Sequence, residues 1–421
     1  MTITRMPRRP ASAHRDDRVA SRAEAHVGAR HPILRTSLIY VALFSGSGLN
    51  QPYLPAWLVA RGLGASDIAL VLSLPMLLRL VAAPLFGALA DRSGDSRVIV
   101  RIMAICVLAL ALALSSARGL LPILLLATGM MVMSQSIGPI VDASVLSLIR
   151  RGIARDFGRI RLWGSASFAA MTVLGGFILE WGGPDAVFGT FILATASLAA
   201  ASFLLPAAAP ASRGVARGKA ALLDRKLLCV VFLVAALVLA SHATFNSFGT
   251  VYMRELGYPA GVIGLQWALA TSAEIMMFWA GPAVGRILGP FGLLALAAGA
   301  ATLRWSLMSL HPGIILTAML QILHAATFSG SYLGLMLFVQ AAVEDEVGAR
   351  AQSAFATLLG LLTAATTMAT GPLYARFGAG AFQAAAALPA VALLFLLVFR
   401  EKLRAMPRDA VRSRKAKEAQ S

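Results

Sequence analysis

The sequence predicts an all-α membrane protein with twelve transmembrane helices arranged as two six-helix halves. Hydrophobic residues make up 58% of the chain and charged residues 13%, with a mean hydropathy of +0.76; soluble domains carry about 25% charged residues. The apolar residues also fall in long blocks rather than amphipathic stripes. A run of about 20 apolar residues crosses a bilayer as a helix, because lipid offers no partners to exposed backbone groups. The predicted helices cover approximately residues 35–60, 66–90, 98–116, 120–148, 162–182, 186–206, 228–253, 260–285, 291–310, 313–340, 351–374 and 380–399.

A central stretch without a spanning run separates the two predicted halves. It begins at Pro206, is rich in proline and alanine, and becomes basic toward Lys226. We therefore expect five parts in order. They are a basic disordered cytoplasmic tail (1–32), an N-terminal half (33–206), a central cytoplasmic loop (207–226), a C-terminal half (227–400) and a basic cytoplasmic tail (401–421).

The halves resemble each other in sequence at their second helices. Aligning Ile68 with Ile263 places Arg79 opposite Glu274. The second helix of each half therefore carries one charge at the corresponding position. Internal repeats with a site between them near the bilayer midplane are typical of secondary transporters.

The net charge of +18 is explained mainly by topology. If both termini are cytoplasmic, 31 of the 37 Lys and Arg residues lie on the cytoplasmic side and four on the other. Such a bias fixes orientation by the positive-inside rule. The interpretation is a multi-pass protein of the bacterial inner membrane with both termini cytoplasmic, surrounded by lipid, and it argues against nucleic-acid binding.

Motifs for enzymatic chemistry are missing from the sequence. The two cysteines, Cys106 and Cys229, lie in predicted helices without metal-ligand spacing. Neither a phosphate-binding loop, a zinc-protease helix nor a nucleophile elbow occurs. We expect no catalytic residues, no metal and no cofactor, and hence a protein that is not an enzyme.

A glycine- and charge-rich segment closes the second predicted helix on the cytoplasmic side. It runs from Gly87 to Arg97, and it resembles the loop 2–3 signature of the major facilitator superfamily, with Asp95 replacing a commonly basic residue. Glycines permit a tight turn and close helix contact. The alternative is an ordinary hairpin. The candidate gating residues are Gly87, Asp91, Arg92, Gly94 and Arg97.

Ionisable residues inside the predicted helices are few, and such residues are costly in lipid and usually functional. They are Arg79, Asp142, Arg161, Glu274, Arg304 and His324. Helical spacing places Glu274 on one face with Trp267 and Thr271, and apolar surroundings favour its protonated form. A structural ion pair is the alternative for Glu274, a packing role for His324, and a topological charge for Arg161.

The first predicted helix contains two prolines and a possible polar face. Asn50, Tyr53 and Trp57 fall near one side of the helix, where they would line a cavity. Anchoring of Tyr53 and Trp57 at the membrane interface is the alternative.

The chain resembles the phenylpropionate permease branch of the major facilitator superfamily, which is similar to lactose permease. The resemblance covers about residues 33–400. It is carried by Pro52-Tyr53, Trp57-Leu58, Pro139 with Asp142, Arg159–Ser165, His242-Ala243, Ala273-Glu274, Leu303–Trp305 and Gln321–His324 with Thr327-Phe328.

That resemblance implies roles for the buried charges. In lactose permease the residues matching Asp142 and Arg161 hold the sugar, and those matching Glu274, Arg304 and His324 belong to the sugar and proton network. Thr327 departs from lactose permease, which has a proton-carrying glutamate at that position. The phenylpropionate branch also has threonine there, and it implies uptake of small aromatic acids.

The predicted function is proton-coupled import of a small organic solute, such as an aromatic carboxylate, by alternating access in a monomer. Arginine binds carboxylates through two parallel hydrogen bonds, which makes Arg161 and Arg304 the candidate clamps. The predicted substrate-binding residues are Asn50, Tyr53, Asp142, Arg161, Trp267 and Arg304, and the predicted proton-coupling residues are Glu274 and His324.

Three alternatives remain open at this stage. One is a proton symporter for a sugar or nucleoside. A second is a drug–proton antiporter, although Gly175-Gly176 lacks the Gly-Pro-x-x-Gly-Gly run of that class. A third is a non-transporting receptor or scaffold, which the buried charges disfavour because lipid makes them costly.

Overall fold

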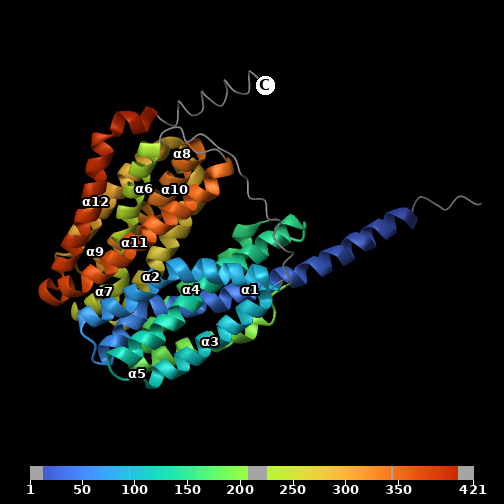
Figure 1. Ribbon diagram of the computed structural model, residues 1–421, viewed down its shortest axis with the longest axis horizontal. Helices are drawn as coiled ribbons and strands as arrows, with labels where there is room; N and C mark the ends of the chain where they lie inside the picture. Colours follow the sequence, from blue (N-terminus) through green and yellow to red (C-terminus); the bar gives the residue numbers. More distant parts are fainter. Residues whose placement is uncertain (1–12, 94, 155, 207–224, 343–344, 406–421) are drawn as a thin grey trace, which may run out of the picture.

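The regular elements in the part of the chain that the structure describes are all helices (Figure 1). The computed structural model describes residues 13–93, 95–154, 156–206, 225–342 and 345–405, with side chains from Pro32 onward except 342–349. The helices are α1 (Ala13–Ala60), α2 (Ala65–Arg92), α3 (Ser96–Ser116), α4 (Leu120–Arg150), α5 (Phe157–Ser202), α6 (Arg225–Ala240), α7 (Ala243–Glu255), α8 (Ala260–Met308), α9 (Ile314–Ile322), the π-helical turn η1 (Ala325–Ser329), α10 (Gly330–Ala342), α11 (Asp345–Phe377) and α12 (Gly380–Val398).

Twelve membrane crossings follow from these helices, as the sequence predicts. Ten segments of the described chain are long and apolar enough to span a membrane. Two of them, α5 and α8, are interrupted by Gly183 (φ 73°) and Gly289 (φ 63°), each followed by a proline. Positive φ suits glycine, and proline starts a new helix readily. Each of these two helices therefore makes two crossings joined by a sharp turn.

Two predicted helices are irregular in the structure. The crossing predicted at 228–253 breaks between α6 and α7 at Ser241 and His242, whose side chains bond to backbone carbonyls of the preceding turn. Such bonds compete with the helical ladder. The crossing predicted at 313–340 contains the π-helical turn η1, a feature often found at functional sites.

The helices form two bundles, α1–α5 and α6–α12, which meet mainly through α2 with α11 and α5 with α8 (Figure 1). α1 begins at Ala13, inside the predicted tail of residues 1–32, whose disorder stays a prediction. Most of the predicted loop 207–226 and of the tail 401–421 lies outside the described residues.

The bundles pack tightly at one end, here called the closed end, which carries the turns around Gly62, Gly183 and Gly257. A Cβ added at Gly176 would lie 2.5 Å from the Ala260 carbonyl oxygen, and one at Gly371 would lie 2.5 Å from Ala69 Cβ. Glycine thus permits the helices of opposite halves to touch there. The opposite end, called the open end, carries two turns, one at Asp95 between α2 and α3 and one at Gly289 within α8.

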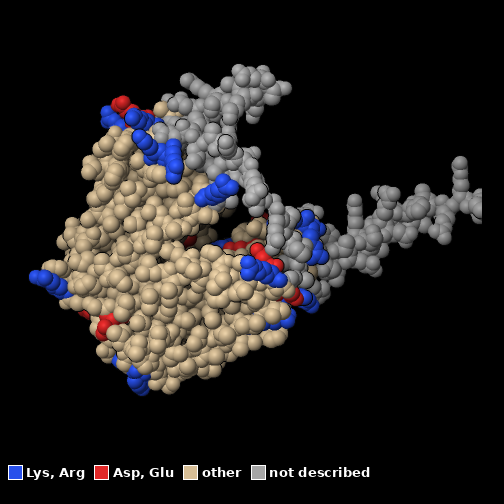
Figure 2. Space-filling view, in the orientation of Figure 1, with Lys and Arg blue, Asp and Glu red and all other residues tan. Residues whose placement is uncertain are grey.

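The outer surface between the two ends is apolar, and the coloured charges lie mostly at its margins (Figure 2). Large side chains such as Trp181, Trp279 and Ile287 are more than 80% exposed on this surface. A soluble protein rarely exposes so much apolar area, whereas a lipid-facing surface requires it.

Candidate functional site

A cavity of about 310 Å³ lies between the two bundles and is lined by residues of both. The space-filling view shows a hollow there, on the side where α1 begins, with charged atoms visible inside (Figure 2). We call it the charged cavity, and its lining residues are Phe44, Gln51, Arg161, Ser165, Phe168, His242, Phe245, Asn246, Trp267, Ala270, Thr271, Glu274, Arg304, Gln321, His324 and Phe328.

The N-terminal half contributes an ion pair at the wall of this cavity. Arg161, in the second turn of α5, lies 3.4 Å from Asp142 on α4, and the Tyr40 hydroxyl donates to the other oxygen of Asp142 at 2.5 Å. The guanidinium also lies over the Phe44 ring at 5.6 Å. Arg161 remains 45% exposed, so its charge is accessible from the cavity.

The C-terminal half contributes a chain of three ionisable side chains. A guanidinium nitrogen of Arg304 lies 3.0 Å from Nδ1 of His324, and Nε2 of His324 lies 3.5 Å from a Glu274 oxygen. Arginine only donates, so Nδ1 must accept and the ring proton sits on Nε2, facing Glu274. His324 is therefore neutral in this arrangement and links a cation to a carboxyl group.

Arg304 is 2% exposed, and its hydrogen-bond partners among the described residues are neutral. It donates to Gln321 Oε1 at 2.7 Å as well as to His324, and it lies 4.4 Å from the centre of the Trp305 ring. Within the described residues no carboxylate lies within 4 Å of it. Burying a cation without an anion is costly, so an anion entering the cavity would be strongly attracted here.

A second histidine joins the two helix irregularities. His242, at the break between α6 and α7, lies 2.9 Å from the Thr327 hydroxyl in η1, and its ring centre is 5.1 Å from that of His324. Thr327 thus faces a histidine at the position where the sequence resemblance pointed to a lost glutamate. These contacts hold the π-helical turn beside the charged cavity.

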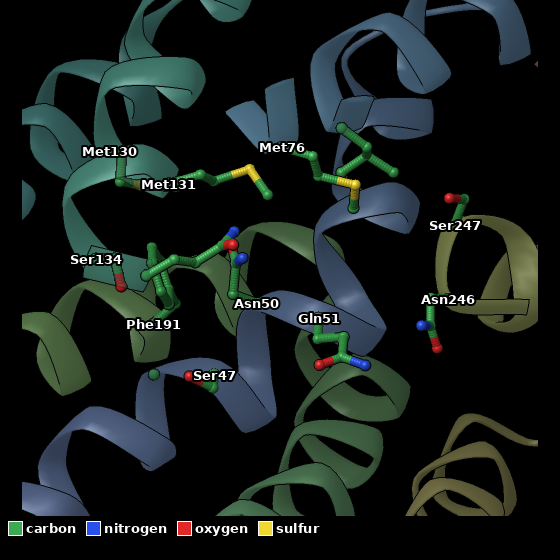
Figure 3. Close-up of a pocket in the computed structure, with 13 residues that line it drawn as sticks. Ser47, Asn50, Gln51, Met76, Met130, Met131, Ser134, Phe191, Asn246 and Ser247 are labelled. Carbon is green, nitrogen blue, oxygen red and sulfur yellow. The ribbon is translucent and has the colours of Figure 1, made fainter. Parts of the chain in front are cut away.

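A second cavity of about 320 Å³ adjoins the first and shares Gln51 and Asn246 with it. We call it the methionine cavity (Figure 3), and its lining residues are Gly46, Ser47, Asn50, Gln51, Leu72, Met76, Met130, Met131, Ser134, Gln135, Phe191, Asn246 and Ser247. It contains amide, hydroxyl, thioether and apolar groups and no charged side chain.

The structure brings most of the predicted binding and coupling residues together. Arg161, Trp267, Glu274, Arg304 and His324 line the charged cavity, with Asp142 behind Arg161, and Asn50 lines the methionine cavity. Thr271 lines the charged cavity with Trp267 and Glu274, as the helical spacing predicts.

Tyr53 lines neither the charged cavity nor the methionine cavity; together with Trp57 it lines a small void of about 10 Å³. Its hydroxyl donates to the Thr172 carbonyl, and it is 2% exposed next to Gly264 at the closed end. Trp57 is also buried, with its indole donating to Asp185 at 2.9 Å. In this conformation both aromatic residues join neighbouring helices, and the substrate-binding role of Tyr53 stays a prediction.

Within the described residues, the hydrogen bonds and ion pairs of the predicted gating segment stay inside the N-terminal half. The Arg97 guanidinium donates to both carboxylate oxygens of Asp95 at 2.7–3.0 Å, and this holds the pKa of the Asp95 carboxyl below its usual value. Asp91 and Arg92 are exposed at the open end. Gly87 has no atom near its Cβ position, and Gly94 lies outside the described residues.

Sequence reasoning missed several lining residues. His242, Gln321 and Asn246 are polar residues inside predicted spans, and this signal alone would have marked them as candidates. Tyr40, which donates to Asp142, was missed because an isolated tyrosine in a span has many packing roles.

A two-bundle helical protein with buried charges around a central cavity has the form of a membrane transporter. The chain belongs to the MFS_1 like family, whose family model matches residues 33–384, and hence to the major facilitator superfamily.

Relatives and solved structures agree with this membership. The "Probable 3-phenylpropionic acid transporter" of Escherichia coli (strain K12) is 28% identical over 374 residues, covering 85% of this chain and 96% of the relative. The "Maltose permease" of Geobacillus stearothermophilus is 26% identical, covering 87% and 94%. The crystal structure of nucleoside transporter NupG shares the fold with a TM-score of 0.73, 15% identity and coverage of 88% and 98%. A bacterial Spinster homologue in an inward-facing conformation gives a TM-score of 0.69, 14% identity and coverage of 91% and 98%.

Proposed function

We propose that this transporter imports a small aromatic carboxylate together with protons across the bacterial inner membrane. The carrying observation is Arg304, a buried cation whose partners within the described residues are neutral, in a cavity that Arg161 also lines. A substrate carboxylate between these two arginines would receive charge-assisted hydrogen bonds from both halves. The similarity to a relative named for 3-phenylpropionic acid supports the same class of solute.

Proton coupling is assigned to Glu274 with His324. Glu274 faces the charged cavity, and among the described residues the ionisable side chain within 4 Å of its carboxyl group is the neutral His324, 3.5 Å away. A carboxyl group in that setting loses less by taking up a proton than one paired with arginine. Protonation of Glu274 would leave the cavity more positive, so proton uptake and anion binding would favour each other.

The charge distribution supports an orientation of the protein in the membrane. The closed end carries few basic residues, namely Arg61, Arg118, Arg254 and Arg376. By the positive-inside rule this end faces the periplasm. The structure then corresponds to an inward-open state of a monomer with both termini in the cytoplasm, and the state that is open to the periplasm would load the solute.

A neutral sugar is the second candidate, favoured by the similarity to a maltose permease. In that case Asp142 and Arg161 would bind hydroxyl groups, and Arg304 would stay with His324 and Gln321. The two candidates differ in their need for a negative charge on the solute.

Uptake by reconstituted vesicles tests the proposal. An imposed pH gradient, acidic on the closed-end side, should drive accumulation of labelled 3-phenylpropionate, and 3-phenylpropionamide should compete poorly. Equal competition by acid and amide, or uptake of maltose in place of the acid, would overturn the carboxylate assignment.

A further inference from the structure

The methionine cavity has a chemistry that suits the uncharged end of an amphipathic solute. Thioether groups of Met76 on α2 and of Met130 and Met131 on α4 line it together with Phe191 on α5. Methionine adapts its shape and makes favourable sulfur–aromatic contacts. Figure 3 shows the α4 methionines and Asn246 of α7 on opposite sides of the space, so the cavity lies between the two halves.

One polar atom of this cavity has no partner. Oδ1 of Asn50 is buried and accepts no hydrogen bond in the described structure. A buried acceptor left unpaired costs about 1–3 kcal/mol. A ligand with a hydrogen-bond donor at this point would remove that cost, whereas a purely apolar ligand would leave the acceptor unpaired.

A neighbouring amide offers the complementary group. Arg79 donates to the Oε1 of Gln135 at 2.8 Å, so the carbonyl of this amide is engaged and its N–H groups are what remains for a ligand. Gln135 lines the same cavity as Asn50. A hydroxyl group can donate to Asn50 and accept from Gln135 at once. Arg79 lines neither cavity, and its hydrogen bond orients the Gln135 amide.

The two cavities are adjacent, because Gln51 and Asn246 line both. A solute with its carboxylate in the charged cavity can therefore extend its ring into the methionine cavity. We propose that the methionine cavity binds the aromatic ring of the solute and that Asn50 Oδ1 selects rings bearing a hydroxyl group. This assignment rests on the proposed transport of aromatic carboxylates and narrows it to hydroxyaryl acids.

Binding of three kinds of probe to the purified full chain tests this assignment. The probes are 3-phenylpropionate, its ring-hydroxylated isomers and the matching ring-fluorinated isomers, which cannot donate. At least one hydroxylated isomer should bind about three- to tenfold more tightly than its fluorinated counterpart, as expected for one neutral hydrogen bond. Asn50→Leu should abolish that preference, measured as the ratio of the two Kd values, and Asn50→Asp, which keeps an acceptor, should retain it.

Gln266→Leu is the matched control. Gln266 also has a buried Oε1 without a partner in the described structure, but it lines neither cavity, so this variant should keep the wild-type preference. Equal binding of hydroxylated and fluorinated probes by the wild type, or a preference that survives in Asn50→Leu, overturns the hydroxyl selection. Failure of all three kinds of probe to bind would overturn the carboxylate transport itself, and with it this assignment.

Discussion

His324 and Glu274 approach each other across the charged cavity, with Nε2 of the histidine 3.5 Å from Oε2 of the carboxyl group. The other ring nitrogen of His324, Nδ1, accepts a hydrogen bond from Arg304 at 3.0 Å. Because Arg304 fixes the histidine proton on Nε2, the histidine offers Glu274 a donor and no acceptor. A proton arriving at Glu274 would weaken this contact, so the protonation state of Glu274 is linked to the position of Arg304.

Glu274→Gln should abolish uphill accumulation while sparing exchange of solute across the membrane. The amide mimics the protonated carboxyl group, and exchange needs no net release of the proton. Both modes can be measured in vesicles with and without an imposed pH gradient. Glu255→Gln is the control, because Glu255 accepts from Tyr374 away from the cavity. Retained accumulation by Glu274→Gln would move the coupling role to another group.

Arg304→Ala should weaken binding of the carboxylate solute by roughly a hundredfold or more, because leaving a buried charge without its partner costs about 3–5 kcal/mol. Arg304→Lys keeps the charge but lacks the planar fork, so its affinity for the acid should lie between those of the wild type and Arg304→Ala. Calorimetric Kd values for the acid and its amide would separate charge from packing. If Arg304→Ala lowered the affinity for both ligands equally, Arg304 would be a structural residue. Arg254→Ala, at the exposed end of α7, should bind normally.

The sequence predicted the crossings well, because two local signals determine them. Apolar block length places the helices, and Gly183-Pro184 and Gly289-Pro290 mark the turns inside α5 and α8. The ionisable residues inside the predicted helices also pointed to the cavity, because lipid restricts such residues to the protein interior.

Contacts between distant helices could not be predicted in the same way. Helical spacing placed Asn50 and Tyr53 near one face of α1. In the structure α5 packs against Tyr53, one turn further along, while Asn50 lines the methionine cavity. The bond between His242 and Thr327 joins residues 85 positions apart. Neither arrangement leaves a trace in local periodicity.

Asp91→Asn should slow transport by up to about fivefold without changing solute affinity. Asp91 is exposed at the open end and has no ion-pair partner among the described residues, so we expect its charge to act when that end closes. Partly exposed pairs contribute about 0–1 kcal/mol. Turnover and Kd measured on the same preparation would check this.

Asp95→Ala provides the contrast to Asp91→Asn. Asp95 caps α3 and pairs with Arg97, so its loss should lower thermal stability more than turnover. Because the folded pKa of Asp95 is lowered, its contribution to stability is present above the unfolded pKa and is lost as the pH falls through the folded pKa.

Normal turnover in Asp91→Asn would argue against a gating role for the Gly87–Arg97 segment.

Reporter fusions should place Arg97, Arg151, Arg217 and the C-terminus in the cytoplasm, and Gly64 and Gly257 in the periplasm. The asymmetry of Lys and Arg between the two ends is the physical reason. Paired alkaline phosphatase and fluorescent-protein fusions at each position measure it. A periplasmic C-terminus would reverse the orientation and turn the described state into an outward-open one.

Gly264→Val should prevent the closed end from closing. A Cβ at Gly264 would lie 2.5 Å from the Thr172 carbonyl oxygen and 2.9 Å from the Tyr53 hydroxyl, and both atoms belong to the opposite half. The Thr172 backbone cannot move aside as a flexible side chain would, so the two halves must separate at this point. The population of conformations should therefore shift toward the state that is open at this end.

A cysteine introduced at Thr271, in the charged cavity, would report this shift. In a background without Cys106 and Cys229, its reaction with an impermeant thiol reagent added on the closed-end side should rise several-fold in Gly264→Val. Gly189→Val is the control, because a Cβ at Gly189 meets no atom within 4 Å. Transport should fall in the first variant, since alternating access requires both ends to close in turn, and persist in the second. Unchanged labelling together with full transport in Gly264→Val would mean that the contact between α5 and α8 does not form the seal.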